Sequence, residues 1–144
     1  MSSLKCNCIY LITHNIEISA NFYCQLLNTK IDRRFEDRWV QIKTANNFTV
    51  GLLNINYDIK KISSGVDVEN HYDENFIKNL QKNFTVGNTV VINFISSDFQ
   101  KDYDRIKKMW PDKVSPTQYV NYMFPYNFFV IKDPDGHVIE IADS

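Results

Sequence analysis

The chain has only three cysteines among its 144 residues, and their spacing suggests no disulfide framework. Cys6 and Cys8 lie two positions apart on a predicted strand, which separates their Cα atoms by about 7 Å, a poor distance for a bridge. Cys24 is the third. We therefore expect reduced thiols, in a chain long enough to bury a core without cross-links.

The chain also lacks an excess of either charge. Its 16 basic and 17 acidic residues are spread along the sequence and leave a formal net charge of −1. A surface that binds a nucleic-acid backbone is normally strongly basic, so we expect no nucleic-acid partner.

Long apolar runs are missing too. No segment approaches the roughly 18 consecutive apolar residues of a membrane span, and the first residues have no hydrophobic core of a signal peptide. We therefore expect a cytoplasmic protein with no membrane partner.

Aromatic residues, in contrast, are abundant. Ten Phe, eight Tyr and two Trp make up 14% of the chain. Any single aromatic side chain is more often part of the core than of a site, but such a set can also line a small-molecule pocket.

The most informative segment spans residues 129–141, where two apolar runs flank the Asp-Pro-Asp-Gly sequence at 133–136. Proline presets its φ, the residue before it is held extended, and glycine can take positive φ, so the segment predicts a β-hairpin. On the returning strand Glu140 alternates with Ile139 and Ile141. A carboxylate in this apolar strand is unusual and marks a candidate site.

The order of predicted elements occurs twice. A strand at 6–13 precedes a helix that begins at an Asn15 cap and runs to about residue 28. The second copy has a strand at 89–95 and a helix at 97–110, for which Ser97 and Gln100 form a capping box. Each helix is followed by three expected strands, at 30–35, 38–44 and 48–54 in the first copy and near 115–122, 128–132 and 137–142 in the second. A shift of about 82 residues relates the copies.

The length is typical of one domain, so we expect a single domain over residues 1–144. Its first module covers about 5–55 and its second about 88–144. The polar linker at 56–87 has a break at 63–65 and one expected helix at 73–83. Such a linker either closes over a cleft as a lid or is a plain surface connection.

Two βαβββ units, the Phe22 and Tyr23 pair in the first helix and a hairpin followed by Glu140 together resemble the vicinal oxygen chelate superfamily. Its members include glyoxalase I, extradiol dioxygenases and bleomycin-resistance proteins. The resemblance implies an α+β fold of two tandem βαβββ modules that form a curled, mixed-sheet cup. It also implies a homodimer, and a divalent metal on the floor of the cup.

The metal positions that the resemblance implies are mostly occupied by other residues. Near the start of each first strand they fall on Cys8 and on Val90 or Val91, and residues 49–54 contain no Glu, Gln or His. Only Glu140 matches. A divalent metal that acts as a Lewis acid needs about three protein ligands. If a metal binds, Glu140 with Cys8 and Gln41 is the candidate set. The histidines, at 14, 71 and 137, are expected in surface or turn positions.

Alternation along the strands predicts which side chains line the cup if Glu140 faces it. A hairpin register that pairs Lys132 with Val138 places Val130 opposite Glu140. Val40 and Ile42 fit the helix side of their strand, which leaves Trp39 and Gln41 for the cup. The predicted ligand-binding residues are Glu140, Cys8, Tyr10, Trp39, Gln41, Phe128 and Val130.

Three roles for Glu140 stay open. It can anchor a cationic or hydrogen-bonding ligand, act as a general base with a raised pKa, or be a relic whose carboxylate a tyrosine or an amide satisfies. A base needs a second group that stabilises developing charge, and none is evident.

The preferred hypothesis is therefore a cofactor-free protein of the sequestration or resistance type that binds a small, partly aromatic molecule. The alternative is a divalent-metal-dependent lyase, isomerase or dioxygenase of the same superfamily. A regulatory module that merely retains the fold is a third possibility.

Overall fold

The computed structural model describes residues 3–121 and 123–144. The chain divides into two compact units, and the boundary between them in the sequence lies between Thr85 and Val86. Met1, Ser2 and Tyr122, the last residue of one expected strand, lie outside the described residues. Each unit contains one four-stranded mixed sheet with open edges. None of the helices in the described ranges is long and apolar enough to cross a membrane.

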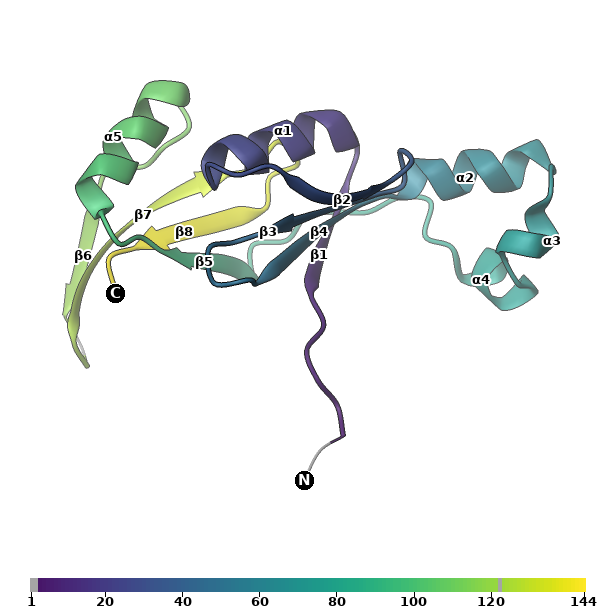
Figure 1. Ribbon diagram of the computed structural model, residues 1–144, viewed down its shortest axis with the longest axis horizontal. Helices are drawn as coiled ribbons and strands as arrows, with labels where there is room; N and C mark the ends of the chain where they lie inside the picture. Colours follow the sequence, from purple (N-terminus) through teal and green to yellow (C-terminus); the bar gives the residue numbers. More distant parts are fainter. Residues whose placement is uncertain (1–2, 122) are drawn as a thin grey trace. The chain divides into compact units, whose positions relative to one another are not determined.

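The first unit is built on a sheet in the order β1-β4-β3-β2, in which β1 runs parallel to β4 and the other pairs are antiparallel. One helix, α1, lies along one face of this sheet (Figure 1). The elements are β1 (Ile9–Thr13), α1 (Ile16–Leu26), β2 (Ile31–Phe35), β3 (Trp39–Lys43) and β4 (Thr49–Asn54).

The predicted start of α1 is confirmed, because the Asn15 side chain accepts hydrogen bonds from the backbone N–H groups of Glu17 (3.1 Å) and Ile18 (3.2 Å). The apolar side of α1 packs on β3 and β4. Burying this stripe against the sheet is the main favourable term for a helix of only three turns. The buried side chains of α1, β3 and β4 include Phe22, Tyr23, Leu26, Val40, Ile42 and Leu52.

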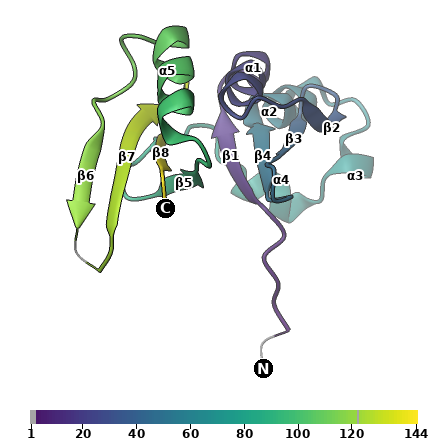
Figure 2. The ribbon, with the colours of Figure 1, turned by 60° about the vertical axis from the view of Figure 1, so that its left-hand side comes forward.

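The second unit repeats this plan with a sheet in the order β5-β8-β7-β6 and one helix, α5, across it (Figure 2). Phe129 is buried beneath the rings of Phe99 and Tyr103, at centroid distances of 5.5 and 5.1 Å. The elements are β5 (Val91–Ile95), α5 (Phe99–Met109), β6 (Gln118–Asn121), β7 (Pro125–Lys132) and β8 (Val138–Ala142). The predicted α+β fold of two βαβββ modules is confirmed.

The helices of the two units match each other in length more closely than the sequence predicted. The predicted capping box of Ser97 and Gln100 is wrong, because Asp98 caps α5 and accepts a hydrogen bond from the Lys101 N–H (3.4 Å). The carboxylate competes well with the preceding serines since it also complements the positive end of the helix dipole. The caps Asn15 and Asp98 are therefore 83 positions apart, and α1 and α5 are both 11 residues long.

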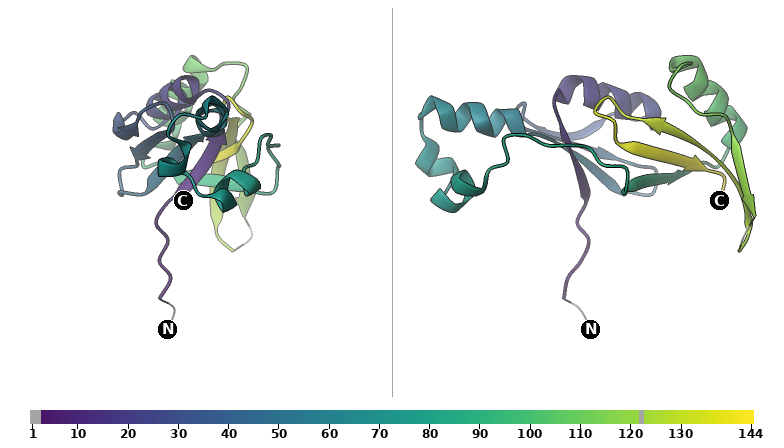
Figure 3. Two further views of the ribbon diagram at one scale, coloured as in Figure 1. Left: turned by 90° about the vertical axis from the view of Figure 1, so that its right-hand side faces the viewer. Right: turned by 180° about the vertical axis from the view of Figure 1, so that it is seen from behind.

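Three short helices follow β4 within the first unit, where one helix at 73–83 was expected. They are α2 (Ile55–Ser64), α3 (Val68–His71) and α4 (Glu74–Asn79). The polar linker sequence hides α2 because this helix begins immediately after β4, with the Asn54 side chain as its cap (3.2 Å to the Asn56 N–H). Figure 3 shows α2 leading away from the end of β4, with α3 and α4 folded back beside it.

Candidate functional site

The hairpin between β7 and β8 is fixed by one buried carboxylate. Asp133 Oδ1 accepts hydrogen bonds from the backbone N–H groups of Asp135 and His137, both at 2.9 Å, and its Oδ2 lies 2.7 Å from His137 Nδ1. This contact raises the pKa of His137 above its ordinary value, although burial opposes the shift. Gly136 adopts the positive φ (97°) that the turn requires. These bonds set the register of the two strands.

That register is the predicted one. Lys132 pairs with Val138, and Val130 lies directly opposite Glu140. Because Phe129 and Ile139 are buried on the helix side, Val130 and Glu140 lie on the open face of the second sheet. The hairpin thereby places the half-buried Glu140 carboxylate on this face, beside Val130.

Glu140 has a partner that sequence reasoning missed. On its other side β8 pairs with β5, where Asn93 stands opposite Glu140, and Asn93 Nδ2 donates a hydrogen bond to Glu140 Oε1 (2.8 Å). No described residue contacts Oε2 through a hydrogen bond or ion pair. The resemblance implied Val90 or Val91 as the metal-ligand position of this strand, and Asn93 was overlooked because the register of β5 against β8 is set only when the sheet forms.

An aromatic row continues this face along β7. Phe124, Tyr126 and Phe128 stack at alternate positions, with centroid distances of 6.0 Å and 5.6 Å between successive rings. Phe128 was predicted to line the site, whereas Tyr126 was missed because β7 begins three residues earlier than expected. Extending the alternation back from Phe128 past Asn127 would have found Tyr126. The row ends beside Val130 and thus next to Glu140.

The open face of the first sheet carries three of the predicted residues. Tyr10 pairs with Gly51, which in turn pairs with Gln41, so the three positions form one row across β1, β4 and β3. The rings of Tyr10 and Trp39 meet edge to face at 5.6 Å. Cys8 is half-buried just before β1 begins.

Gly51 is required by this packing. A Cβ atom built on Gly51 would lie 2.5 Å from the Trp39 ring and 2.9 Å from Tyr10 Cβ, so no side chain fits without displacing them. Gly51 lies in the last strand of its unit, opposite Tyr10, just as Glu140 lies opposite Asn93 in the second unit. The first unit therefore has an aromatic surface at the position where the second has a carboxylate.

The side chains on these faces are poor ligands for a divalent metal. The second sheet offers one carboxylate and one amide, and the first offers the Gln41 amide and the soft Cys8 thiol near a glycine. Among residues 3–121 and 123–144, the one group of three His, Cys, Asp or Glu side chains with suitable spacing lies in the hairpin turn, at 133, 135 and 137. Asp133 is engaged there in stabilising the turn, and Glu140 is not part of the group.

The two sheets, each with one helix across it, define a class of α+β proteins built from tandem βαβββ units. Residues 5–141 match the Glyoxalase/Bleomycin resistance protein/Dioxygenase superfamily, and the chain belongs to this family. No curated protein sequence matches the chain.

Solved structures of the same fold include several glyoxalase-like proteins. Lactoylglutathione lyase from Agrobacterium tumefaciens is 14% identical, with a TM-score of 0.60 over 93% of this chain and 89% of that one. A glyoxalase-related enzyme from Fulvimarina pelagi is 14% identical, with a TM-score of 0.65 over 96% and 86%. A hypothetical protein from S. aureus is 20% identical, with a TM-score of 0.63 over 99% and 96%. At these identities the similarity establishes the fold alone.

Proposed function

We propose that this protein binds a small, partly aromatic molecule without a metal, and that Glu140 anchors a cationic or hydrogen-bond-donating group of that ligand. The ligand would be sequestered rather than converted, as in the bleomycin-resistance branch of the superfamily. The alternative within the family is a divalent-metal-dependent lyase, isomerase or dioxygenase.

The observation that carries this proposal is the environment of Glu140. The Asn93 amide fixes Oε1 at 2.8 Å, while Oε2 has no partner among the described residues. A half-buried carboxylate that is oriented in this way loses little conformational entropy when it accepts a donor from a ligand. Hydrogen bonds between an ionised carboxylate and a cationic donor are also about twice as strong as neutral ones.

The aromatic row on β7 supplies the apolar part of the proposed site. Tyr126 and Phe128 are half-buried on the strand that also carries Val130. Aromatic side chains contribute large contact areas and stack well on flat ligands. Tyr10 and Trp39 offer a comparable surface on the first sheet, and we propose that they, with Gln41 and Cys8, form ligand contacts there.

A metal is left out of the proposal because the donor set is unsuitable. One carboxylate, two amides and a thiol do not supply the oxygen-rich or imidazole-rich shell that hard or borderline divalent ions need. Asn93 also occupies one oxygen of Glu140, the one carboxylate among the described residues of the second open face. The same hydrogen bond that weakens Glu140 as a metal ligand orients it as an anchor for an organic group.

Ligand binding is tested by thermal unfolding with matched probes. Phenethylamine and phenylpropionate have similar size and opposite charge, and a ligand at 100 times its dissociation constant stabilises a protein by about 2.7 kcal/mol. We expect the amine to raise the melting temperature more than the acid, and Glu140→Gln to abolish the difference. Asp104→Asn, which removes an exposed carboxylate from α5, is the matched control and should preserve it. An unchanged response to the amine in Glu140→Gln would refute the assignment of Glu140.

We also propose that the protein is a homodimer. Apolar side chains are exposed on β5, an edge strand of the second sheet, where Val91 is 49% and Ile95 is 70% exposed. Natural proteins usually cover or pair such edges. Sedimentation equilibrium should give twice the chain mass, and Ile95→Lys should shift the protein to monomer. A monomer in the unmodified protein at all concentrations would contradict the proposal.

A further inference from the structure

A pocket lies entirely within the first unit, between the β2–β3 turn and the helices α2, α3 and α4. Its volume is about 700 Å³, within the range of about 300–1,000 Å³ that is usual for small-molecule sites. Its lining includes four aromatic rings and two basic side chains: Phe35, Tyr57, Tyr72, Phe76, Arg38 and Lys61. Apart from Phe35, which pairs with Trp39 at the β2–β3 turn, these residues lie outside the strands of the sheet.

The base of the pocket is held in place by Asp58, which is only 1% exposed. Its carboxylate accepts hydrogen bonds from Arg38 Nε (2.7 Å), Arg38 Nη2 (3.1 Å) and the Tyr72 hydroxyl (2.6 Å). One buried group thus orients a guanidinium from β3's N-terminal turn and a phenol that follows α3.

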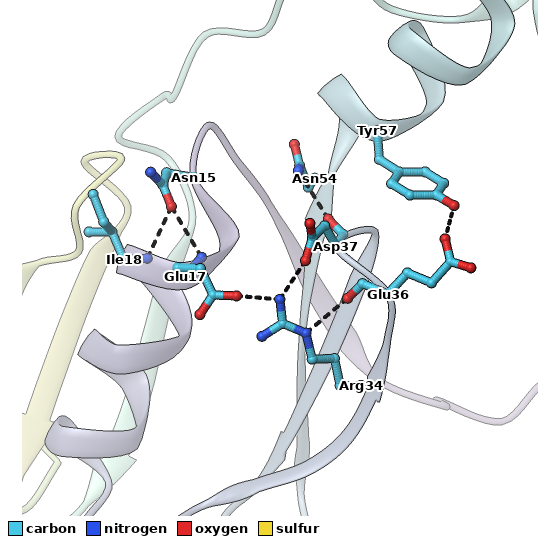
Figure 4. A network of polar contacts seen from close by, with 8 residues as sticks. All are labelled: Asn15, Glu17, Ile18, Arg34, Glu36, Asp37, Asn54 and Tyr57. Atoms are coloured by element: carbon cyan, nitrogen blue, oxygen red, sulfur yellow. Dashed lines mark hydrogen bonds and ion pairs between the residues drawn. The ribbon is translucent and has the colours of Figure 1, made fainter. Parts of the chain in front are cut away.

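The acidic side chains of the lining are already engaged within the protein. The Tyr57 hydroxyl donates a hydrogen bond to the Glu36 carboxylate, as Figure 4 shows together with the contacts that fix the β2–β3 turn. Asp73 caps α4 by accepting a hydrogen bond from the Phe76 N–H (2.7 Å). In contrast, the Lys61 ammonium has no ion pair or hydrogen bond within the described ranges. Among the charged side chains of the lining, Lys61 is therefore the one without a partner in the described residues.

The aromatic rings of the pocket are only partly covered. Phe35 is 62% exposed and Phe76 is 38% exposed, and the Phe76 ring stacks on that of Tyr72 (5.1 Å between centroids, 21° between planes). Covering such exposed apolar side chains with a flat apolar group removes their surface from water, and this burial favours binding. The stacked pair also presents a flat surface of suitable shape.

We infer that this pocket binds a planar aromatic carboxylate. The ring system would pack against Phe35 and the Tyr72 and Phe76 pair, and the carboxylate would accept a hydrogen bond from the Lys61 ammonium. A hydrogen bond from a lysine ammonium to a carboxylate is charge-assisted, and it strengthens when the aromatic part of the ligand excludes water. Glu36 and Asp73 each have a hydrogen-bond partner within the protein, whereas the Lys61 ammonium has none among the described residues, so we expect an anionic ligand to bind better than a cationic one.

Isothermal titration with naphthoate tests this inference, with naphthalenemethanol and naphthylmethylamine as neutral and cationic probes of the same ring. The three probes are compared in the Glu140→Gln variant, which lacks the proposed cation anchor, and there we expect saturable binding of one naphthoate per chain and much weaker binding of the other two. Lys61→Gln should weaken naphthoate binding about tenfold, the equivalent of one charge-assisted hydrogen bond. Lys60→Gln removes the same charge from the exposed neighbouring residue of α2 and should leave the affinity unchanged.

The outcomes also separate this pocket from the proposed Glu140 site. Glu140→Gln should leave naphthoate affinity unchanged. If Glu140→Gln abolishes naphthoate binding while Lys61→Gln does not, the probe binds at the sheet face and the inference is wrong. Equal affinities for the three probes, equal effects of Lys60→Gln and Lys61→Gln, or no saturable binding would overturn it as well.

Discussion

The ion pair between Arg38 and Asp58 gives the sharpest prediction for stability. Arg38→Met keeps most of the aliphatic length of the side chain but removes two charge-assisted hydrogen bonds from a carboxylate that is 1% exposed. Tyr72 then remains as its one hydrogen-bond donor among the described residues. Breaking a buried ion pair by removing one partner costs about 3–5 kcal/mol. Because the Arg38 side chain is itself 32% exposed, water can partly replace it, and we expect about 3 kcal/mol.

The measurement is urea unfolding followed by circular dichroism. With a urea dependence of about 1–3 kcal/mol per molar, the Arg38→Met midpoint should fall by 1 M or more. Arg34→Met is the matched control, because Arg34 forms ion pairs with the exposed Glu17 and Asp37 and should contribute no more than about 1 kcal/mol. Equal losses in the two variants, or a loss below about 0.5 kcal/mol in Arg38→Met, would refute the buried ion pair.

Three further predictions follow from individual contacts. Burial, with a hydrogen bond to the buried Asp58 carboxylate, raises the pKa of Tyr72 to about 12. The stabilising contribution of Tyr72 is therefore present below the unfolded pKa of about 10 and is lost as the pH rises to about 12. Absorbance titration should show a phenol that ionises near pH 12 and that Tyr72→Phe removes. The pKa of His137 is raised mainly by its hydrogen bond to Asp133, so its contribution is complete below the unfolded value of about 6.5 and is lost as the pH rises through the folded value. His137→Gln should therefore lower the melting temperature more under acidic than under alkaline conditions, and an equal loss at all pH values would contradict the contact. Gly51→Ala should displace the Trp39 ring, cost about 1–3 kcal/mol and shift the tryptophan emission; an unchanged spectrum and midpoint would show that the close approach is absent.

Local patterns were sufficient to predict the hairpin, the Asn15 cap and the core faces, but not the cap of α5, which is Asp98 instead of Ser97. The turn residues and the alternation of Ile139 with Glu140 depend on neighbours in sequence, and so does the side-chain cap at Asn15, all of which the structure contains. The opposition of Val130 and Glu140 followed from the hairpin alone because a short turn fixes its own register.

Features that depend on distant pairing were missed. Asn93 reaches Glu140 only because β5 joins the sheet beside β8, 47 positions along the chain. The pocket in the first unit likewise needs α2, which begins directly after β4 in a sequence that looked like polar linker. Its ion pair joins Arg38 to Asp58 across 20 positions. No periodicity in a single sequence specifies such registers, because they are decided by packing between elements.

The central claim is that Glu140 anchors an organic ligand directly, without a metal. Calorimetric titration of phenethylamine into the unmodified protein in the presence of EDTA tests it most directly. We predict binding that is unaffected by the chelator and lost in Glu140→Gln. Binding that EDTA abolishes and that added Zn²⁺, Ni²⁺, Mn²⁺ or Fe²⁺ restores would contradict the account and favour the metal-dependent alternative.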